Sequence, residues 1–141
     1  SERLILRQNT KSVNVDDLDS VVSSQAILNA QSVIHDIYVD EKVEDYVLNL
    51  VFATRNPAEH GLNDLEGIIE YGASPRATIN LIRGAKARAF MEHRGYITPE
   101  DIRYSGADVL RHRIILTYEA EAEELTTEDV IQRLFEVVEV P

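Results

Sequence analysis

The sequence predicts a mainly α-helical protein, a small helical bundle with one or two short extended segments. Apolar residues recur at three- and four-residue spacing in several segments, which is the period of one helix face. Two of these segments follow strong helix start signals, Thr98-Pro99-Glu100-Asp101 and Thr126-Thr127-Glu128-Asp129, which combine a capping hydroxyl with first-turn acids. Because no repeat or low-complexity stretch is present, we expect one compact bundle.

One domain is expected, because 141 residues is a common single-domain size. Residues 1–22 are predicted to form a short first helix, over Glu2 to Gln8, and a polar linker, while residues 23–141 form the helical domain. The chain starts at Ser1, and its single methionine is Met91. We therefore expect it to be a piece of a longer protein.

Two longer helices are predicted between residues 23 and 55. Ser23 or Ser24 can cap the first, because a serine oxygen accepts a free N–H group of the first turn. The apolar residues expected to face a core are Ala26, Ile27, Ala30, Val33, Ile34 and Ile37. Asp40 can cap the second helix, which is expected to end at Thr54-Arg55. Its predicted buried face consists of Val43, Val47, Leu48, Val51 and Phe52.

A long helix is predicted from Pro75 to about His93, where Gly95 is well placed to end it. It follows a loop over residues 56–71, in which Ile68-Ile69-Glu70 can form a short extended piece. One row of the helix carries small residues that let another helix approach closely. This row consists of Ala77, Leu81, Ala85 and Ala89.

Two further helices are predicted towards the end of the chain. The first begins after Thr98, and we expect Gly106 to break it before one more turn. Ile114-Ile115-Leu116 fits either a short strand or a buried helical end, because so short an apolar run has no decisive period. The last helix begins after Thr126 and continues to about Val138.

The best candidate for a binding site is the start of the long helix, from Gly72 to Arg76. Ser74 can cap the helix, Pro75 suits its first position, and Gly72 gives the incoming backbone freedom to turn. The free N–H groups and the positive end of the helix dipole attract an anion. Arg76 adds a forked, permanently charged donor that matches phosphate oxygens. The pattern favours phosphate contact over catalysis, although any helix can start this way for structural reasons alone.

The charge pattern leaves two interpretations of this helix open. The net charge is −11, which argues against a nucleic-acid surface. Within it, residues 72–96 are basic, with Arg76, Arg83, Lys86, Arg88 and Arg94 against Glu92 alone. This segment is either the solvated face of an amphipathic helix or a functional basic face.

No metal or catalytic constellation is predicted. The sequence has no cysteine, and its four histidines lack metal-ligand spacing. Asp40-Glu41 follow an apolar run, as in a magnesium-coordinating strand, but Asp40 suits a helix cap better. Arg111-His112-Arg113 and Thr54-Arg55 are most simply helix ends, where the dipole favours cations. No glycine-rich phosphate loop is present, so the chain alone is not expected to hydrolyse a nucleotide.

In order along the chain, several motifs resemble those of MoxR-type AAA+ ATPases. They are Tyr46 with Ala53-Thr54-Arg55, Gly72-Ala73-Ser74-Pro75-Arg76-Ala77, Arg94-Gly95-Tyr96-Ile97-Thr98-Pro99-Glu100-Asp101-Ile102, Val109-Leu110-Arg111-His112-Arg113-Ile114, and Val138-Glu139-Val140-Pro141. The resemblance extends from Glu2 to the end and is to the C-terminal helical lid of that family. It implies that a nucleotide-binding core with Walker motifs precedes Ser1.

The resemblance also implies a site and partners. Arg76 would be a sensor arginine for the γ-phosphate of ATP, supported by Gly72 and Ser74. Apart from the resemblance, a contact with another subunit or domain stays open for Arg55 and Arg113 as the alternative to simple helix ends. ATP and Mg²⁺ would be bound mainly by the core domain of the same chain. The full-length protein would be a cytoplasmic ATP hydrolase that assembles as a ring, typically a hexamer, and acts as a chaperone on an unidentified client protein.

A different function class stays open beside the lid. The chain would then be a stand-alone helical module whose acidic surface binds a protein partner, with Arg76 simply exposed. The sequence upstream of Ser1 separates the two hypotheses, because only the lid requires a phosphate-loop motif there. Neither hypothesis includes nucleic-acid binding, a bound metal in this chain or a membrane span, since no apolar run approaches spanning length.

Overall fold

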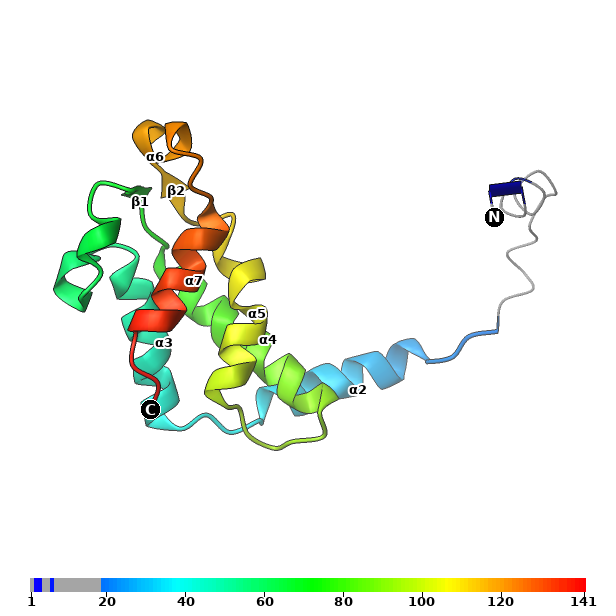
Figure 1. The fold of residues 1–141 in the computed structure, drawn as a ribbon. Helices are drawn as coiled ribbons and strands as arrows, with labels where there is room; N and C mark the ends of the chain where they lie inside the picture. The colour runs from blue at the N-terminus through cyan, green and yellow to red at the C-terminus, as the bar shows by residue number, and fades with distance from the viewer. Residues whose placement is uncertain (1, 4–5, 7–18) are drawn as a thin grey trace. The chain divides into compact units, whose positions relative to one another are not determined.

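The computed structural model describes residues 2–3, 6 and 19–141 (Figure 1). Its contacts divide the chain into two compact units, residues 1–32 and 33–141. Most of the expected first helix and of the expected linker lies outside the described residues. The division between linker and lid near residue 22 therefore stays a prediction.

Helix α2 (Ser24–His35) forms where the sequence predicts a helix. The Ser23 hydroxyl caps it by accepting the Ala26 N–H at 3.1 Å. Of the six residues expected to face a core, Ile37, which follows the helix, is buried at 6% exposed. For α2 itself the expected burial is wrong, because none of its residues is buried and Ile27 and Val33 are about half exposed. An amphipathic pattern identifies an apolar face but does not specify what covers it.

Residues 33–141 form a helical bundle, as predicted (Figure 1). Its longer helices are α3 (Glu41–Ala53), α4 (Pro75–Met91), α5 (Pro99–Leu110) and α7 (Thr127–Val137). Strands β1 (Ile69–Tyr71) and β2 (Ile115–Leu116) and the short helix α6 (Tyr118–Ala122) lie together at one end of this bundle. The core is apolar and is contributed by all four longer helices.

The extended segments form one small antiparallel sheet. Ile69 pairs with Leu116, and Tyr71 pairs with Ile115. The extended segment predicted near residues 68–70 is therefore confirmed. Of the two structures that residues 114–116 allowed, a strand or a helical end, the strand is the one formed. The rest of the predicted loop contains two single-turn 3-10 helices, Ala58–His60 and Asn63–Leu65.

Helix α3 begins at its Asp40 cap as predicted, since Oδ1 of Asp40 accepts the Lys42 N–H at 2.9 Å. Its buried residues are Val43, Tyr46, Val47, Leu50, Val51 and Ala53. The expected burial of Leu48 and Phe52 is wrong, because Leu48 is 38% exposed and Phe52 is 44% exposed. Apolar residues surround much of α3, so contacts with α4, α5 and α7 decide which side is inside.

Helix α4 buries the predicted row of small residues completely. At Gly84 a Cβ atom would lie 3.0 Å from the Ser105 hydroxyl oxygen of α5, so the two helices approach closely there. The helix ends at Met91, and His93 adopts a left-handed φ of 57°. His93, rather than the expected Gly95, therefore makes the turn out of the helix.

Helix α5 is continuous, so the expected break at Gly106 is wrong. A Cβ atom at Gly106 would lie 2.3 Å from Cζ of Phe135, whose ring comes from α7. The glycine therefore makes room for a packed aromatic ring and costs the helix only about 1 kcal/mol in propensity. Helix α7 follows the Thr126 cap as predicted.

Candidate functional site at the start of helix α4

The candidate phosphate site is the first turn of α4. Ser74 occupies the predicted cap position with an extended backbone, and Pro75 takes the first helical position. The carbonyl of Ser74 accepts the Ala77 N–H at 2.8 Å, but the Ser74 side chain makes no capping hydrogen bond. No acidic residue occupies the first turn. The helix therefore begins at the predicted residue, but the expected side-chain cap by Ser74 is wrong, and we call this uncapped start open.

Gly72 allows a close approach of two backbone segments. A Cβ atom there would lie 2.3 Å from the Thr54 carbonyl oxygen at the end of α3. The φ of Gly72 is not in the left-handed region, so the glycine is not required for the unusual backbone conformation that the sequence suggests. It is required because it has no side chain. Any side chain would push the loop away from α3.

Thr54, which the sequence analysis did not single out as a functional residue, ties this loop to α3. It is 1% exposed, and its hydroxyl donates to the Val51 carbonyl at 2.7 Å and accepts the Ala73 N–H at 2.8 Å. The neighbouring Arg55 donates from Nε to the Ala73 carbonyl at 2.7 Å. The Ala53-Thr54-Arg55 and Gly72-Ala73 motifs are thus one structural unit.

Arg76 lies exposed in the first turn of α4. With the residues that the structure describes, it makes no hydrogen bond and no ion pair, and the same holds for Arg83 two turns later. These two arginines differ from the rest of the basic segment, whose cations have partners inside the chain. The guanidinium of Arg76 is therefore available to a ligand from outside.

At the C-terminal end of the basic segment, the arginines stabilise the fold through an ion pair. Asp101 is 1% exposed and binds the Arg94 guanidinium through both oxygens, at 2.9 and 2.6 Å. Arg88 lies 3.4 Å from the same carboxylate. Burial opposes ionisation of Asp101, but the bonds from Arg94 and Thr98 outweigh it, so the pKa of Asp101 lies below its usual value. Arg88 and Arg94 are therefore held by an ion pair within the chain, and a functional role for the Arg76 end of the segment stays a prediction.

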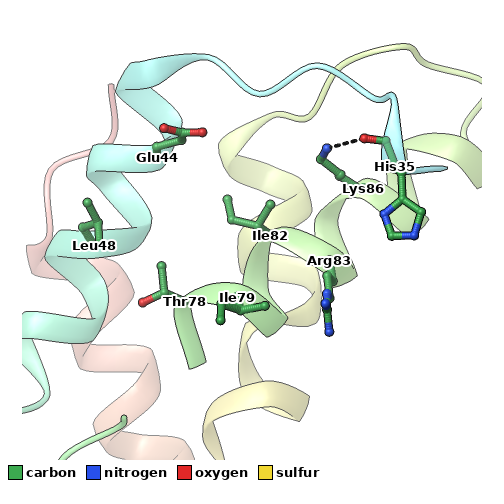
Figure 2. A pocket seen from close by; sticks show the side chains of 8 residues that line it. All are labelled: His35, Glu44, Leu48, Thr78, Ile79, Ile82, Arg83 and Lys86. Carbon is green, nitrogen blue, oxygen red and sulfur yellow. Dashed lines mark hydrogen bonds between the residues drawn. The ribbon is translucent and has the colours of Figure 1, made fainter. Parts of the chain in front are cut away.

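A hollow of about 440 Å³ lies between α3 and α4 (Figure 2). Leu48 on α3 and Ile79 and Ile82 on α4 make it partly apolar, and Glu44 and Arg83 add charges. Lys86 donates to the His35 carbonyl at 2.8 Å at one side of the hollow. No pattern in the sequence indicates this hollow, because Leu48 is expected to lie in the core.

The remaining candidates are held at helix ends. Arg113 is half-buried and donates to the Val109 carbonyl in the last turn of α5, which agrees with the helix-end interpretation. The Arg55 backbone N–H donates to the Phe52 carbonyl of α3 at 2.8 Å, but its side chain holds the Ala73 carbonyl, as described above.

The described residues contain no group of three or more histidine and acidic side chains that could hold a metal ion. Asp40 caps α3, as predicted, with the Lys42 N–H as its partner. Across the same residues, no helix is both long and apolar enough to cross a membrane.

The helical bundle corresponds to a known domain class. Residues 65–134 match the family model described as "AAA lid domain". The chain is 39% identical to Chaperone MoxR1 of Mycobacterium tuberculosis over 86% of this chain and 32% of the relative. It is 33% identical to Protein MoxR of Methylorubrum extorquens over 79% of this chain and 34% of the relative.

A solved structure agrees with this class. The crystal structure of a candidate ATPase from Cytophaga hutchinsonii matches with a TM-score of 0.90 and 41% identity, covering 99% of this chain and 42% of that one. The chain is an AAA lid domain and, over most of its length, is homologous to the MoxR-type AAA+ ATPases. It spans about a third of the length of the two curated relatives named above.

Proposed function

We propose that this chain acts as the lid over a nucleotide site and that Arg76 contributes to the binding and hydrolysis of ATP there. The observation that carries the proposal is an exposed arginine in the first turn of α4 that has no partner among the described residues. The match to AAA lid domains supports it, because a lid accompanies an AAA core. ATP and Mg²⁺ would be held mainly by that core.

The chemistry of the site suits a phosphate group. A guanidinium presents several N–H donors in a planar fork, and it keeps its charge at every physiological pH. The first N–H groups of α4 and the positive end of its dipole add to the attraction for an anion. Charge that develops on the phosphate oxygens during hydrolysis would be stabilised by the same donors. The chain itself supplies no general base at this position, so its contribution is electrostatic.

The wider assembly is part of the same proposal. One relative carries the name Chaperone MoxR1, so we infer a chaperone-like role on an unidentified client protein for the longer protein. We also propose a cytoplasmic ring, typically a hexamer, in which Arg55 and Arg113 contact a neighbouring subunit or domain. Arg55 suits such a contact because it is exposed and fixed in place by its bond to Ala73.

The test is ATP hydrolysis by the full-length protein that contains this chain. Arg76→Ala is expected to lower the turnover roughly 100-fold, the typical effect of removing one donor that stabilises transition-state charge. Arg83→Ala is the matched control, because Arg83 is an exposed, unpaired arginine on the same helix. Unchanged turnover and unchanged nucleotide affinity in Arg76→Ala would overturn the sensor role. The 141-residue chain alone should not hydrolyse ATP.

A protein-interaction module is the second candidate function. The observation that favours it is the hollow between α3 and α4, where Leu48 and Ile79 are 38% and 51% exposed. A partly apolar, partly charged depression of this kind is suited to contact with another protein surface. The sequence upstream of Ser1 separates the candidates. A phosphate-loop motif within a strand, loop and helix supports the lid, and its absence supports the module.

A further inference from the structure

We propose that Thr54 is a positioning residue that fixes Arg76 by holding the loop before α4 against the end of α3. This inference rests on the proposed role of Arg76 in ATP hydrolysis. Thr54 touches no nucleotide in this proposal and acts only through the arginine.

Both capacities of the Thr54 hydroxyl are used. It donates to the Val51 carbonyl one turn earlier at 2.7 Å, which orients its lone pairs away from that helix. It accepts the Ala73 N–H at 2.8 Å, across 19 residues of sequence. Thr54 and Ala73 are 1% and 0% exposed, so no water competes for this bond. Such a buried hydroxyl is a strong local constraint on the loop.

Two further contacts hold the same segment in place. Arg55 donates to the Ala73 carbonyl at 2.7 Å, so both backbone polar groups of Ala73 are bound by Thr54 and Arg55, the two residues that follow α3. A Cβ atom at Gly72 would lie 2.3 Å from the Thr54 carbonyl oxygen, which shows how closely the loop lies against α3. The residues just before α4 are thus positioned by α3.

The start of α4 has few other constraints. Ser74 makes no capping hydrogen bond, and no first-turn acid bonds back to the loop. Arg76 itself has no partner among the described residues. Since Ala73 lies three residues before Arg76, a shift of Ala73 moves the first turn of α4 with it. Displacements of about 1 Å in a positioned group can lower a rate by roughly 100-fold.

The experiment compares Thr54→Val and Thr54→Ser in the full-length protein. Valine keeps the shape but removes the hydroxyl, whereas serine keeps the hydroxyl. We expect Thr54→Val to lower kcat roughly 10- to 100-fold with a smaller change in KM, while Thr54→Ser stays close to the wild type. If Thr54→Val fails to fold, Thr54→Ala removes the same hydroxyl with no added bulk.

A double-variant cycle separates positioning from general stability. In the Arg76→Ala background, Thr54→Val should cause no further loss of kcat, because the hydroxyl acts through an arginine that is already absent. Ile102→Val serves as a control, because it loosens the buried core of α5 and should lower the melting temperature without lowering kcat.

Each outcome has a definite meaning. An equal loss from Thr54→Val in both backgrounds, or an unchanged kcat in the wild-type background, overturns the positioning role alone. Full turnover in Arg76→Ala overturns the proposed function and this inference with it. A loss in Thr54→Val that disappears in the Arg76→Ala background and is restored by serine supports the proposal.

Discussion

Helices α4 and α5 begin with the same kind of sequence, a hydroxyl residue followed by proline, yet their starts are built differently. At α5 the Asp101 carboxylate accepts the Thr98 N–H at 2.8 Å and binds Arg94. At α4 the Ser74 side chain makes no capping bond, and no acidic residue lies in the first turn. The first start is closed by its own side chains, and the second is open.

Helix α7 shows that a closed start is the common solution in this chain. Asp129 accepts the Thr126 N–H at 2.9 Å and its hydroxyl at 2.5 Å. These bonds hold the pKa of Asp129 below its usual value. The open start of α4 is therefore a departure that leaves N–H groups and a positive dipole end for an anion from outside. Closed starts contribute stability, and we propose that the open one binds an anion instead.

The largest expected effect comes from opening the start of α5. Asp101→Asn would leave the partly buried Arg94 without its counter-ion and is expected to cost about 3 kcal/mol of unfolding free energy. The matched control is Asp129→Asn, which opens the exposed start of α7 and should lower the unfolding free energy much less. Urea unfolding of the chain measures both. Equal losses would show that burial does not distinguish the two starts.

Lowering the pH should remove the stabilisation that the ionised Asp101 carboxylate provides. The pKa of Asp101 is lowered from 3.8, because the bonds from Arg94 and Thr98 outweigh its burial. A carboxylate with a lowered folded-state pKa stabilises the protein above its unfolded pKa, and this stabilisation is lost as the pH falls through the folded-state value.

The wild type and Asp101→Asn should therefore differ by a constant amount above about pH 5 and converge below pH 3.8. Urea unfolding over this pH range makes the comparison. A difference that stays constant down to pH 2 would contradict the role assigned to the ionised carboxylate.

Local signals explain what the sequence predicts correctly in this fold. Helix caps and first-position prolines act within one turn, so the starts at Asp40, Pro75, Thr98 and Thr126 are all predicted at the right place. The buried row of small residues on α4 is also predicted, because its four-residue spacing places all its members on one face of the helix.

Contacts between distant residues explain the errors. Gly106 does not break α5, because the Phe135 ring of α7 fills the space beside it. Leu48 is exposed although it fits the apolar pattern, since neighbouring helices select the buried side of α3. At the candidate site, the motif identifies Arg76 but not Thr54, whose bond to Ala73 joins residues far apart in the sequence.

The smallest expected change in stability comes from closing the start of α4. Ser74→Asp supplies an acidic cap and is expected to raise the unfolding free energy of the chain by about 0.5–1 kcal/mol. The same carboxylate would compete with phosphate for the N–H groups and for Arg76, so ATP turnover by the full-length protein should fall. Ser74→Asn is the control, because it can cap the helix without adding charge. A Ser74→Asp protein that gains stability and keeps full turnover would mean that the open start serves no anion.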